Sequence, residues 1–534
     1  MLDTKYLVIT GGVLSGLGKG VAAASIGLLF SDDYNVVPLK LDGYLNADPG
    51  TMNPTEHGEV FVLDDGAEVD MDFGHYERFM RTTCTADQNL TMGKVYEAIR
   101  EKERSGDYLG QTVQLIPHVT DYIKDYVTTV SADKNADLVI VEVGGTVGDM
   151  ENELFIEALR QLKGDVGENN VAYAHMTLVP KPTNVKEQKT KPTQQSTKLL
   201  NERGVTPDFM LCRCEEWLMS DVVKKISTFT DVPSNEIYSC VDVESIYEIP
   251  ETFYEQGFHD SLSSKLGLLE PRTETYQEWQ ALLQTPREDD ITVAIAGKYT
   301  DLEDSYASVV ESLRHCEFKH GVDITIDWVE TTGGVHGETL DGVDALIVPG
   351  GFGKRGIEGK IDVIGQARRQ NTPFLGICYG LQLAVVEFAR NVCGYNNAHT
   401  TEVDEATPHP VVSLLDEQED IEKKGGTMRL GGYDAELEPG TVIHSLYNDR
   451  LRDGVVRERH RHRYEVNPAY EDELIEHGLV VSGRMPERGL VEFIELPEEH
   501  HPYFVGTQAH PELTSRLDDA APLFAGLVEA AKSS

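Results

Sequence analysis

The chain lacks long apolar runs and has few basic residues. No stretch of about 18 apolar residues occurs in its 534 residues, so we expect no membrane-spanning helix. Lysine and arginine number 47 against 91 aspartates and glutamates, which gives a formal net charge of −44. A surface of this sign repels the phosphates of nucleic acids. The sequence therefore predicts a protein that binds neither membranes nor nucleic acid.

Cysteines are also few, and a signal peptide is not expected. The seven cysteines are an odd number without the spacing of a disulfide framework, so free thiols in a reducing compartment are the simplest interpretation. The first residues lead directly into a strand-like run, without the basic region, apolar stretch and cleavage site of a leader. We expect a cytoplasmic protein. Its dispersed acidity would repel itself in dilute buffer, which favours a halophilic host.

Strand-like and helix-like segments alternate along the chain in two blocks. This alternation is typical of doubly wound α/β domains, and the chain is too long for one ordinary core. Residues 268–290 interrupt the alternation with prolines and polar residues around a short helical piece, which indicates a linker. We therefore predict an α/β protein with two doubly wound domains, residues 1–267 and 291–534, joined by that linker.

The segment Gly376-Ile377-Cys378-Tyr379-Gly380 follows a predicted strand and opens a predicted helix. Small residues around a cysteine at such a turn form a nucleophile elbow, where the helix N-terminus favours a thiolate. A buried structural cysteine after a strand is the alternative, and this segment alone does not separate the two.

Two other segments favour the nucleophile. Pro349 to Gly353 is a glycine-rich turn after another strand, and its backbone N–H groups suit a developing oxyanion. His510, with Glu512 two residues later, fits a base with its orienting acid. In this order the segments resemble the class I glutamine amidotransferases. The resemblance implies Cys378 as nucleophile, His510 as base and Glu512 as its partner, although Ala509 stands where an aromatic residue is usual.

The first predicted strand is followed by a glycine-rich loop, Gly11 to Gly20, which includes Lys19. It resembles a P-loop that binds phosphates, but Gly20 replaces the Ser/Thr that would hold Mg²⁺. Metal ligands must then come from elsewhere, and Asp70, Asp72 and Glu142 are candidates. Glu142 interrupts an apolar strand near its carboxyl end, so it is either a metal ligand or half of a structural salt bridge.

Two basic segments have alternative interpretations. The run Lys189 to Gln194 places two lysines among hydroxyl and amide groups, and is either an exposed linker or a loop for an anionic ligand. The Arg/His-rich run 457–463 is either a solvated basic face or, because a guanidinium matches a carboxylate, a site for the carboxylate of a substrate.

Nearly the whole chain resembles the CTP synthase family, whose members aminate UTP. The matching segments, in order, are residues 11–20, 40–42, 48–52, 57–62, 74–79, 142–149, 189–194, 425–431 and 458–465. The resemblance departs at Gly16, where serine is frequent, and at Val241, where lysine is common. It implies an ATP-dependent C–N ligase of pyrimidine nucleotide biosynthesis that consumes glutamine or free ammonia through 4-phospho-UTP.

The resemblance assigns roles to individual residues. It places ATP at Gly16, Leu17, Gly18, Lys19, Gly20, Val21, Asp72, Val241, Asp242 and Val243. It places UTP and the inhibitor CTP at Ser15, Asp149, Met150, Glu151, Lys189, Thr190, Lys191, Pro192, Thr193, Gln194 and Lys225. It places glutamine at Gly351, Tyr379, Gly380, Leu381, Gln382, Glu402 and Arg463, and Mg²⁺ at Asp72 and Glu142.

The same resemblance implies further partners and assembly. It implies GTP as an allosteric activator, CTP as a feedback inhibitor, a homotetramer and assembly into filaments. It also implies an internal channel for ammonia, with His57 and Val60 near its synthetase end, and a mobile lid at 425–431.

Two rival functions remain open at this stage. One is another ATP-dependent amidoligase with a fused glutaminase, such as a cobyrinate amidase, against which the segments 57–79 and 189–194 argue. The other is a sensing or filament-forming protein with dead sites, which should have lost triad or metal residues, and this chain has lost none.

Overall fold

The computed structural model describes residues 3–52, 58–185, 187–298, 303–332, 339–414 and 428–533. The chain forms two compact units, one of residues 1–51 and 72–283 and the other of residues 52–71 and 284–534. Helix α11 (Glu274–Leu283), inside the predicted linker, belongs to the first unit. In the described residues, no helix is long and apolar enough to cross a membrane.

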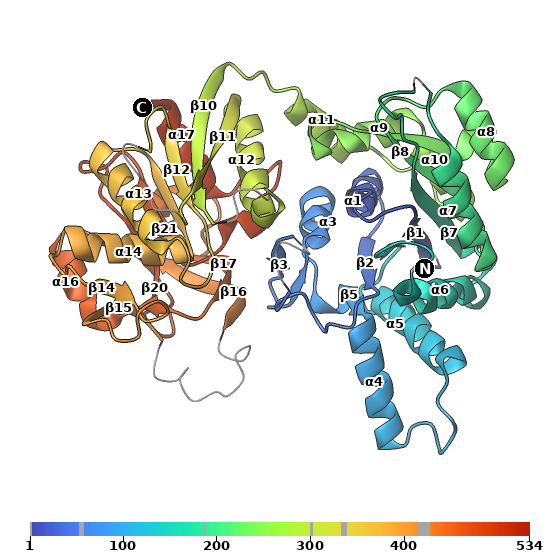
Figure 1. Cartoon of the computed structure of the whole chain (residues 1–534), viewed down its shortest axis with the longest axis horizontal. Coiled ribbons are helices and arrows are strands. Elements are labelled where there is room, and N and C mark those ends of the chain that lie inside the picture. Colours follow the sequence, from blue (N-terminus) through green and yellow to red (C-terminus); the bar gives the residue numbers. More distant parts are fainter. Residues whose placement is uncertain are drawn as a thin grey trace. The chain divides into compact units, whose positions relative to one another are not determined.

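The first unit is built on a parallel sheet (Figure 1). Apolar runs such as that of β6 are buried on both faces, as parallel strands require. Within the described residues the strand order is β5-β2-β6-β1-β7-β8-β9. The strands are β1 (Lys5–Gly11), β2 (Val36–Asp42), β5 (Asn89–Thr91), β6 (Leu138–Val143), β7 (Val171–Leu178), β8 (Phe209–Cys214) and β9 (Ile237–Val241).

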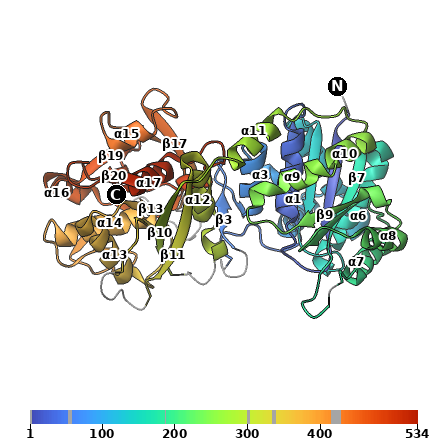
Figure 2. The ribbon, with the colours of Figure 1, turned by 90° about the horizontal axis from the view of Figure 1, so that it is seen from above.

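Helices cover both faces of this sheet. Strand residues such as Val8, Leu39 and Val141 share a core with α4, α5 and α6, whereas α1 packs with α3 and α9 (Figure 2). The helices are α1 (Lys19–Phe30), α3 (Asp72–Met80), α4 (Met92–Ser105), α5 (Thr120–Asp133), α6 (Glu153–Val166), α7 (Lys191–Glu202), α8 (Ser220–Thr230), α9 (Ile249–Glu255), α10 (Phe258–Leu266) and α11.

The second unit contains a mixed sheet. Among the described residues its order is β11-β10-β12-β13-β21-β20-β19-β16-β17, parallel from β11 to β21 and antiparallel beyond. The strands are β10 (Asp289–Gly297), β11 (Val322–Glu330), β12 (Ala345–Val348), β13 (Phe374–Ile377), β16 (Arg429–Leu437), β17 (Val455–His462), β19 (Val480–Arg484), β20 (Val491–Glu495) and β21 (Phe504–Thr507).

Smaller elements complete the second unit. They are the helices α12 (Ala307–His320), α13 (Ile357–Gln370), α14 (Tyr379–Asn391), α15 (Val442–Leu446), α16 (Glu471–Glu476) and α17 (Pro522–Ser533), and the three-stranded sheet of β14 (Ala398–Thr400), β15 (His409–Ser413) and β18 (Glu465–Val466). The predicted fold class, an α/β protein with two α/β units, is confirmed; the antiparallel half of the second sheet was not predicted.

A hairpin from the N-terminal half of the sequence belongs to the second unit. It consists of β3 (Val60–Val62) and β4 (Glu68–Asp70). Arg461 on β17 donates to the Glu68 carboxylate at 2.7 Å, and Arg459 donates to the Val62 carbonyl at 3.1 Å. Sequence order alone does not predict this placement, because the segment lies between two elements of the first unit.

Candidate active sites

The cysteine of the second unit lies at a strained turn. Cys378 joins β13 to α14 with φ 52° and ψ −100°, a backbone conformation that L-residues with a side chain rarely adopt. Its backbone N–H donates to the Thr507 carbonyl on β21 at 2.6 Å, which fixes the turn against the neighbouring strand. Strain of this kind clusters at functional sites, so the turn fits the predicted nucleophile elbow.

The predicted base lies at the end of that neighbouring strand. His510 Nδ1 is 2.6 Å from Glu512 Oε1, and Gly350 leaves room for the imidazole, because a Cβ there would lie 2.7 Å from His510 Cε1 and 3.6 Å from Cys378 Cβ. Burial disfavours the imidazolium, but Glu512 and Cys378 outweigh it and raise the pKa of His510 well above its usual value. The structure therefore brings the three predicted catalytic residues together.

Two further groups contact the thiol. Gln508 Nε2 lies 3.8 Å from the sulfur, and Cys378 Sγ donates to the Arg461 carbonyl at 3.7 Å. Gln382 Nε2 donates to the Tyr464 carbonyl at 2.9 Å, which ties the first turn of α14 to the segment after β17. The sequence patterns did not identify Gln508 and Arg461 as contacts of the thiol. A contact through a side-chain amide or a backbone carbonyl has no characteristic sequence motif.

The glycine-rich turn after β12 is held by two lysines. Lys360 on α13 is 2% exposed and donates to the Pro349 carbonyl at 3.5 Å, and Lys298 donates to the Phe352 carbonyl. Burial lowers the pKa of Lys360 to about 7, with Lys298 acting in the same direction. Both lysines thus hold carbonyls of the turn that contains Gly351.

Two of the predicted glutamine ligands contact this turn. Glu402 accepts a hydrogen bond from the Gly353 N–H at 2.7 Å, and the Tyr379 hydroxyl donates to the Gly353 carbonyl at 3.3 Å. Burial raises the pKa of Glu402, while the Gly353 N–H, Lys298 and Arg463 oppose that shift. The side chains of Glu402 and Arg463 are thus near enough to interact electrostatically. Recognition of an amino acid's ammonium and carboxylate groups requires one negative and one positive side chain of this kind.

A buried ionic cluster lies behind the triad, and the sequence did not indicate it. Arg429 bridges Glu465 at 3.2 Å and Glu492 at 2.6 Å, and His460 Nδ1 lies 3.0 Å from His462 Nε2. Burial raises the pKa of Glu492 to about 8 and that of Glu465 to about 7. Most of the run 457–463 thus lies in β17 with partly or fully buried side chains, and only Arg457 is exposed, so the run is not a solvated basic face.

The phosphate-binding loop of the first unit lies between β1 and α1. Gly16 and Gly18 have φ 73° and 92°, a left-handed backbone conformation that glycine adopts without strain. Lys19 is buried and donates to the Gly145 carbonyl at 2.8 Å. Burial lowers the pKa of Lys19, and nearby Glu142 opposes the shift. An anion in the loop would favour the charged lysine.

The two predicted metal ligands share one lysine. Lys40 contacts Asp72 directly and lies 3.0 Å from Glu142 Oε1, while Tyr76 donates to the other oxygen of Glu142. Burial raises the pKa of Glu142. Burial also acts to raise the pKa of Asp72, but it does not cancel the opposite effect of the nearby positive charges, Lys40 above all, and the pKa of Asp72 is lowered. A Cβ on residue 20 would lie 2.0 Å from Asp72 Oδ1, so Gly20 allows this carboxylate to reach the loop.

This arrangement combines the two alternatives for Glu142. The carboxylate is half of a salt bridge, yet two carboxylates converging beside a phosphate-binding loop are also a donor set that fits Mg²⁺, which usually takes one or two protein carboxylates with phosphates and water. The Lys40 ammonium balances the negative charge of these two carboxylates. The sequence patterns did not identify Tyr76 as a partner of Glu142, because this tyrosine is one of several buried residues of α3 and belongs to no motif.

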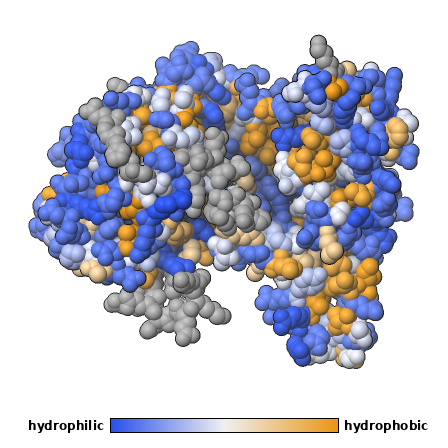
Figure 3. Space-filling view, in the orientation of Figure 1, coloured by the Kyte–Doolittle hydropathy of each residue, from blue (hydrophilic) through white to orange (hydrophobic). Residues whose placement is uncertain are grey.

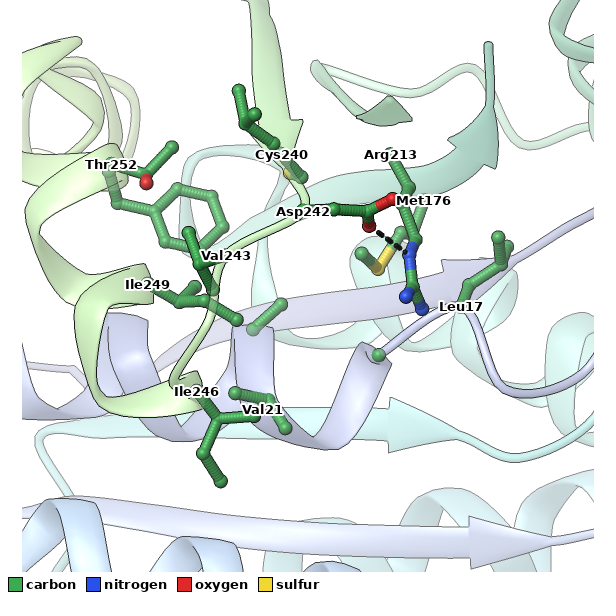
Figure 4. A pocket seen from close by; sticks show the side chains of 14 residues that line it. Leu17, Val21, Met176, Arg213, Cys240, Asp242, Val243, Ile246, Ile249 and Thr252 are labelled. Carbon is green, nitrogen blue, oxygen red and sulfur yellow. Dashed lines mark hydrogen bonds and ion pairs between the residues drawn. The ribbon is translucent and has the colours of Figure 1, made fainter. Parts of the chain in front are cut away.

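A pocket with apolar walls opens beside the loop (Figure 4). Arg213 bridges Asp242 at 2.9 Å on one side, and its other nitrogen donates to the Gly16 carbonyl at 2.9 Å. Six of the predicted ATP residues line this pocket, together with residues of β7, β9 and α9 that were not predicted. The predicted six are Leu17, Gly18, Val21, Val241, Asp242 and Val243.

The predicted UTP residues follow neighbouring strands. Ser15 follows β1, residues 149–151 follow β6 and residues 189–194 follow β7; these strands are adjacent in the order β6-β1-β7. These three segments therefore leave the sheet at its carboxyl edge, where ligands of such sheets bind. Lys225 is on α8. Buried His175 contacts Thr10 and Ser196 below this edge, a network that the sequence did not indicate.

Some predicted features lie outside the described residues. His57, proposed to lie near the ammonia path, is one of them, and so are residues 425–427 of the expected lid. Val60 is described and begins β3.

One chain thus carries the predicted phosphate-binding loop beside two carboxylates in the first unit, and a Cys–His–Glu arrangement in the second. This combination defines the glutamine-dependent synthetases.

The comparisons with known proteins narrow this class. The family described as "CTP synthase N-terminus" matches residues 5–268, and "Glutamine amidotransferase class-I" matches residues 301–530. CTP synthases of Borreliella afzelii and Methanopyrus kandleri are 50% and 49% identical over 536 and 535 residues, covering 99% of each chain. The chain belongs to the CTP synthase family. A solved Trypanosoma brucei CTPS glutaminase domain with bound acivicin is 34% identical, covering 46% of this chain and 94% of its own, with a TM-score of 0.42.

Proposed function

We propose that this protein converts UTP to CTP, using ATP and ammonia released from L-glutamine or supplied free. The observation that supports the proposal most is that a cysteine, histidine and glutamate converge in the second unit, and a glycine-rich loop with Lys19 and two carboxylates lies in the first, in one chain of the CTP synthase family. The cysteine site supplies ammonia, and the site at the loop activates the uracil oxygen that ammonia replaces.

The second unit performs the glutaminase step. The Cys378 thiolate attacks the side-chain amide carbon of glutamine, and the N–H groups of Gly351 and Tyr379 stabilise the oxyanion. His510 delivers a proton to the departing ammonia, then takes one from the water that hydrolyses the γ-glutamyl thioester, while Glu512 holds the imidazole in place. Glu402 and Arg463 bind the charged groups of the glutamine substrate. Gly380, Leu381 and Gln382 form the wall of the glutamine-binding site.

The first unit performs the synthetase step. The loop residues and Lys19 bind the ATP phosphates, and the adenine occupies the pocket beside Val241 and Val243. Asp72 and Glu142 would hold Mg²⁺, which neutralises charge on the phosphoryl group in transfer. Uracil O4 attacks the γ-phosphorus and ADP leaves, which gives 4-phospho-UTP. Ammonia then attacks C4, phosphate departs, and CTP remains.

The hairpin of β3 and β4 connects the two sites through the chain. Glu68 at the start of β4 accepts a hydrogen bond from Arg461, whose carbonyl contacts the catalytic thiol. Asp72, four residues later, contacts Lys40 in the nucleotide site. A sheltered ammonia path near Val60 is part of the proposal, because ammonia that escapes into water is protonated and loses its nucleophilicity.

Regulation and assembly follow from the same proposal. GTP activates the glutaminase step, CTP inhibits by occupying the UTP positions, and the protein acts as a cytoplasmic homotetramer that can form filaments. Exposed apolar side chains support an assembly surface: Leu45, Leu109, Leu115 and Ile116 are 69%, 89%, 54% and 52% exposed, and hydrophobic residues show beside the hydrophilic end of α4 (Figure 3).

A direct assay tests the proposed function. The purified chain, given UTP, ATP, Mg²⁺ and glutamine, should produce CTP, detected by its ultraviolet absorbance and by chromatography, at both low and high KCl. Ammonium chloride should replace glutamine. If ATP is hydrolysed without CTP formation under all of these conditions, the proposal is wrong.

A further inference from the structure

A histidine and two carboxylates converge in the first unit, away from the nucleotide loop. His259 and Asp260 are in the first turn of α10, and Glu270 lies four residues beyond the end of that helix. One ligand atom from each of the three lies within 4.8 Å of the other two. His259 is 6% exposed, whereas both carboxylates are exposed to solvent.

The buried histidine has no hydrogen-bond partner within the described part of the chain. Its Nδ1 is buried without a partner, and its Nε2 lies 3.5 Å from Asp260 Oδ1, beyond the about 3.2 Å of an ordinary N–H···O bond. The ring of Tyr254 stacks on the imidazole with centroids 4.8 Å apart and planes at 7°, which fixes its orientation. The ring is therefore held with Nε2 directed at the Asp260 carboxylate, and a ligand at Nε2 would give this buried imidazole a polar partner, which a buried polar group normally has.

The spacing of these atoms suits a small divalent transition metal. A tetrahedral ion with bonds of about 2.0–2.2 Å places two ligand atoms about 3.4 Å apart, close to the 3.5 Å between His259 Nε2 and Asp260 Oδ1. Imidazole nitrogen is a ligand for zinc and its neighbours, whereas Mg²⁺ and Ca²⁺ prefer oxygen alone. Three protein ligands leave the fourth position for water.

We propose that His259, Asp260 and Glu270 form a binding site for Zn²⁺ or a similar divalent transition metal, separate from the Mg²⁺ of the nucleotide reaction. The ion would connect the first turn of α10 with the segment after the helix. That segment is already held near the end of α1, because Tyr34 donates to the Leu269 carbonyl at 2.9 Å.

The site has a structural consequence for the neighbouring pocket. Tyr254 belongs to α9, and the same helix supplies Ile249, Thr252 and Phe253 to the wall of the pocket beside the phosphate loop. Tyr254 also contacts Tyr276 of α11, with ring centroids 4.4 Å apart. A metal on His259 therefore restrains α9, α10 and α11 through one aromatic stack.

Metal binding to the full-length chain, with any affinity tag removed, tests the proposal. The Cys378→Ala background removes the catalytic thiol, which would itself bind zinc. After chelator dialysis, with millimolar Mg²⁺ present, Co²⁺ should give a visible d–d absorption band that one equivalent of Zn²⁺ abolishes. Zn²⁺ should raise the midpoint of thermal unfolding. Glu270→Gln, at an exposed position, should weaken binding at least about tenfold, since even loss of outer-shell partners has effects of this size.

Matched variants separate the site from general effects of charge. Asp260→Asn and His259→Gln should behave like Glu270→Gln, whereas Glu255→Gln, an exposed carboxylate on α9 that is not in the cluster, should bind like the parent. If His259→Gln does not fold, the two carboxylate variants decide the matter. Equal Zn²⁺ stoichiometry, absorption band and midpoint shift in the parent and in Glu270→Gln and Asp260→Asn would overturn the proposal.

Discussion

The two sites of this chain differ in how far their groups are already assembled. In the second unit, Cys378 lies at a strained turn and His510 already contacts Glu512. In the first unit, the carboxylates Asp72 and Glu142 are held by Lys40. Amide hydrolysis uses only protein groups and so can be preorganised, whereas phosphoryl transfer needs a nucleotide and a cation to complete its site. Variants should therefore separate the two sites cleanly.

The largest expected effect is that of Cys378→Ala. Glutamine-dependent CTP formation should fall by about 10⁵-fold, because no other group forms the thioester. Formation from ammonium chloride should be unchanged, because the first unit does not use the thiol. Parallel assays with the two nitrogen sources measure both effects. Loss of both activities in a folded variant would contradict the separation of the sites.

Glu142→Gln should affect both routes. Removing one charge beside Lys40 and the phosphate loop should lower CTP formation from glutamine and from ammonia alike, by about 10⁴-fold, because stabilisation of the phosphoryl group is lost. Glutamine hydrolysis itself should persist. Glu168→Gln, an exposed change in the same unit, is the control. Normal activity with ammonia would remove Glu142 from the reaction.

Glu512→Gln should weaken the glutaminase and change its pH dependence. Glu512 raises the pKa of His510, so its loss lowers that pKa. The imidazolium that pairs with the thiolate then loses its proton at lower pH. The alkaline limb of the pH–kcat/KM profile for glutamine should therefore shift to lower pH. We expect a drop of about 10³-fold. An unmoved alkaline limb would show that Glu512 does not control His510.

Lys360→Met tests the support of the oxyanion turn. Without the amine, the Pro349 carbonyl is free to turn, and the Gly351 N–H loses its position. The kcat for glutamine should fall by about 10²-fold with little change in KM, as for loss of one oxyanion donor. Lys319→Met, at an exposed position on α12, should have no effect. A raised KM with unchanged kcat would instead indicate a role in substrate binding.

The smallest expected effect is the stabilisation of the protein by salt, which depends on the charge of its whole surface. The net charge of −44 predicts that KCl stabilises both units by screening repulsion. The midpoint of thermal unfolding should rise steadily from dilute buffer to molar KCl, and the space-filling view shows the hydrophilic surface on which screening would act (Figure 3). Equal midpoints at low and molar KCl would remove the halophilic interpretation.

The sequence predicted those features that leave local patterns. Apolar runs marked the buried parallel strands, and the small residues around Cys378 and the glycines before Lys19 marked turns that demand special backbone angles. The pattern also identified His510 and Glu512 as neighbours, because they are only two residues apart.

Features made by distant residues could not be predicted in this way. Lys360 contacts the turn after β12 from a helix, and its position in an ordinary helical segment gives no sign of this. The hairpin of β3 and β4 joins the second unit through Arg459 and Arg461, whose partners lie about 400 residues earlier in the sequence. Such pairings depend on tertiary packing, which periodicity does not encode.

The transfer of nitrogen between the sites is the central claim, and an isotope experiment tests it most directly. The wild-type chain is supplied with UTP, ATP, Mg²⁺, glutamine labelled with ¹⁵N in its amide, and an excess of unlabelled ammonium. The account predicts CTP whose amino nitrogen is enriched in ¹⁵N well above the bulk ammonia, because ammonia passes between the sites without release. CTP with the same ¹⁵N fraction as the bulk ammonia would contradict it.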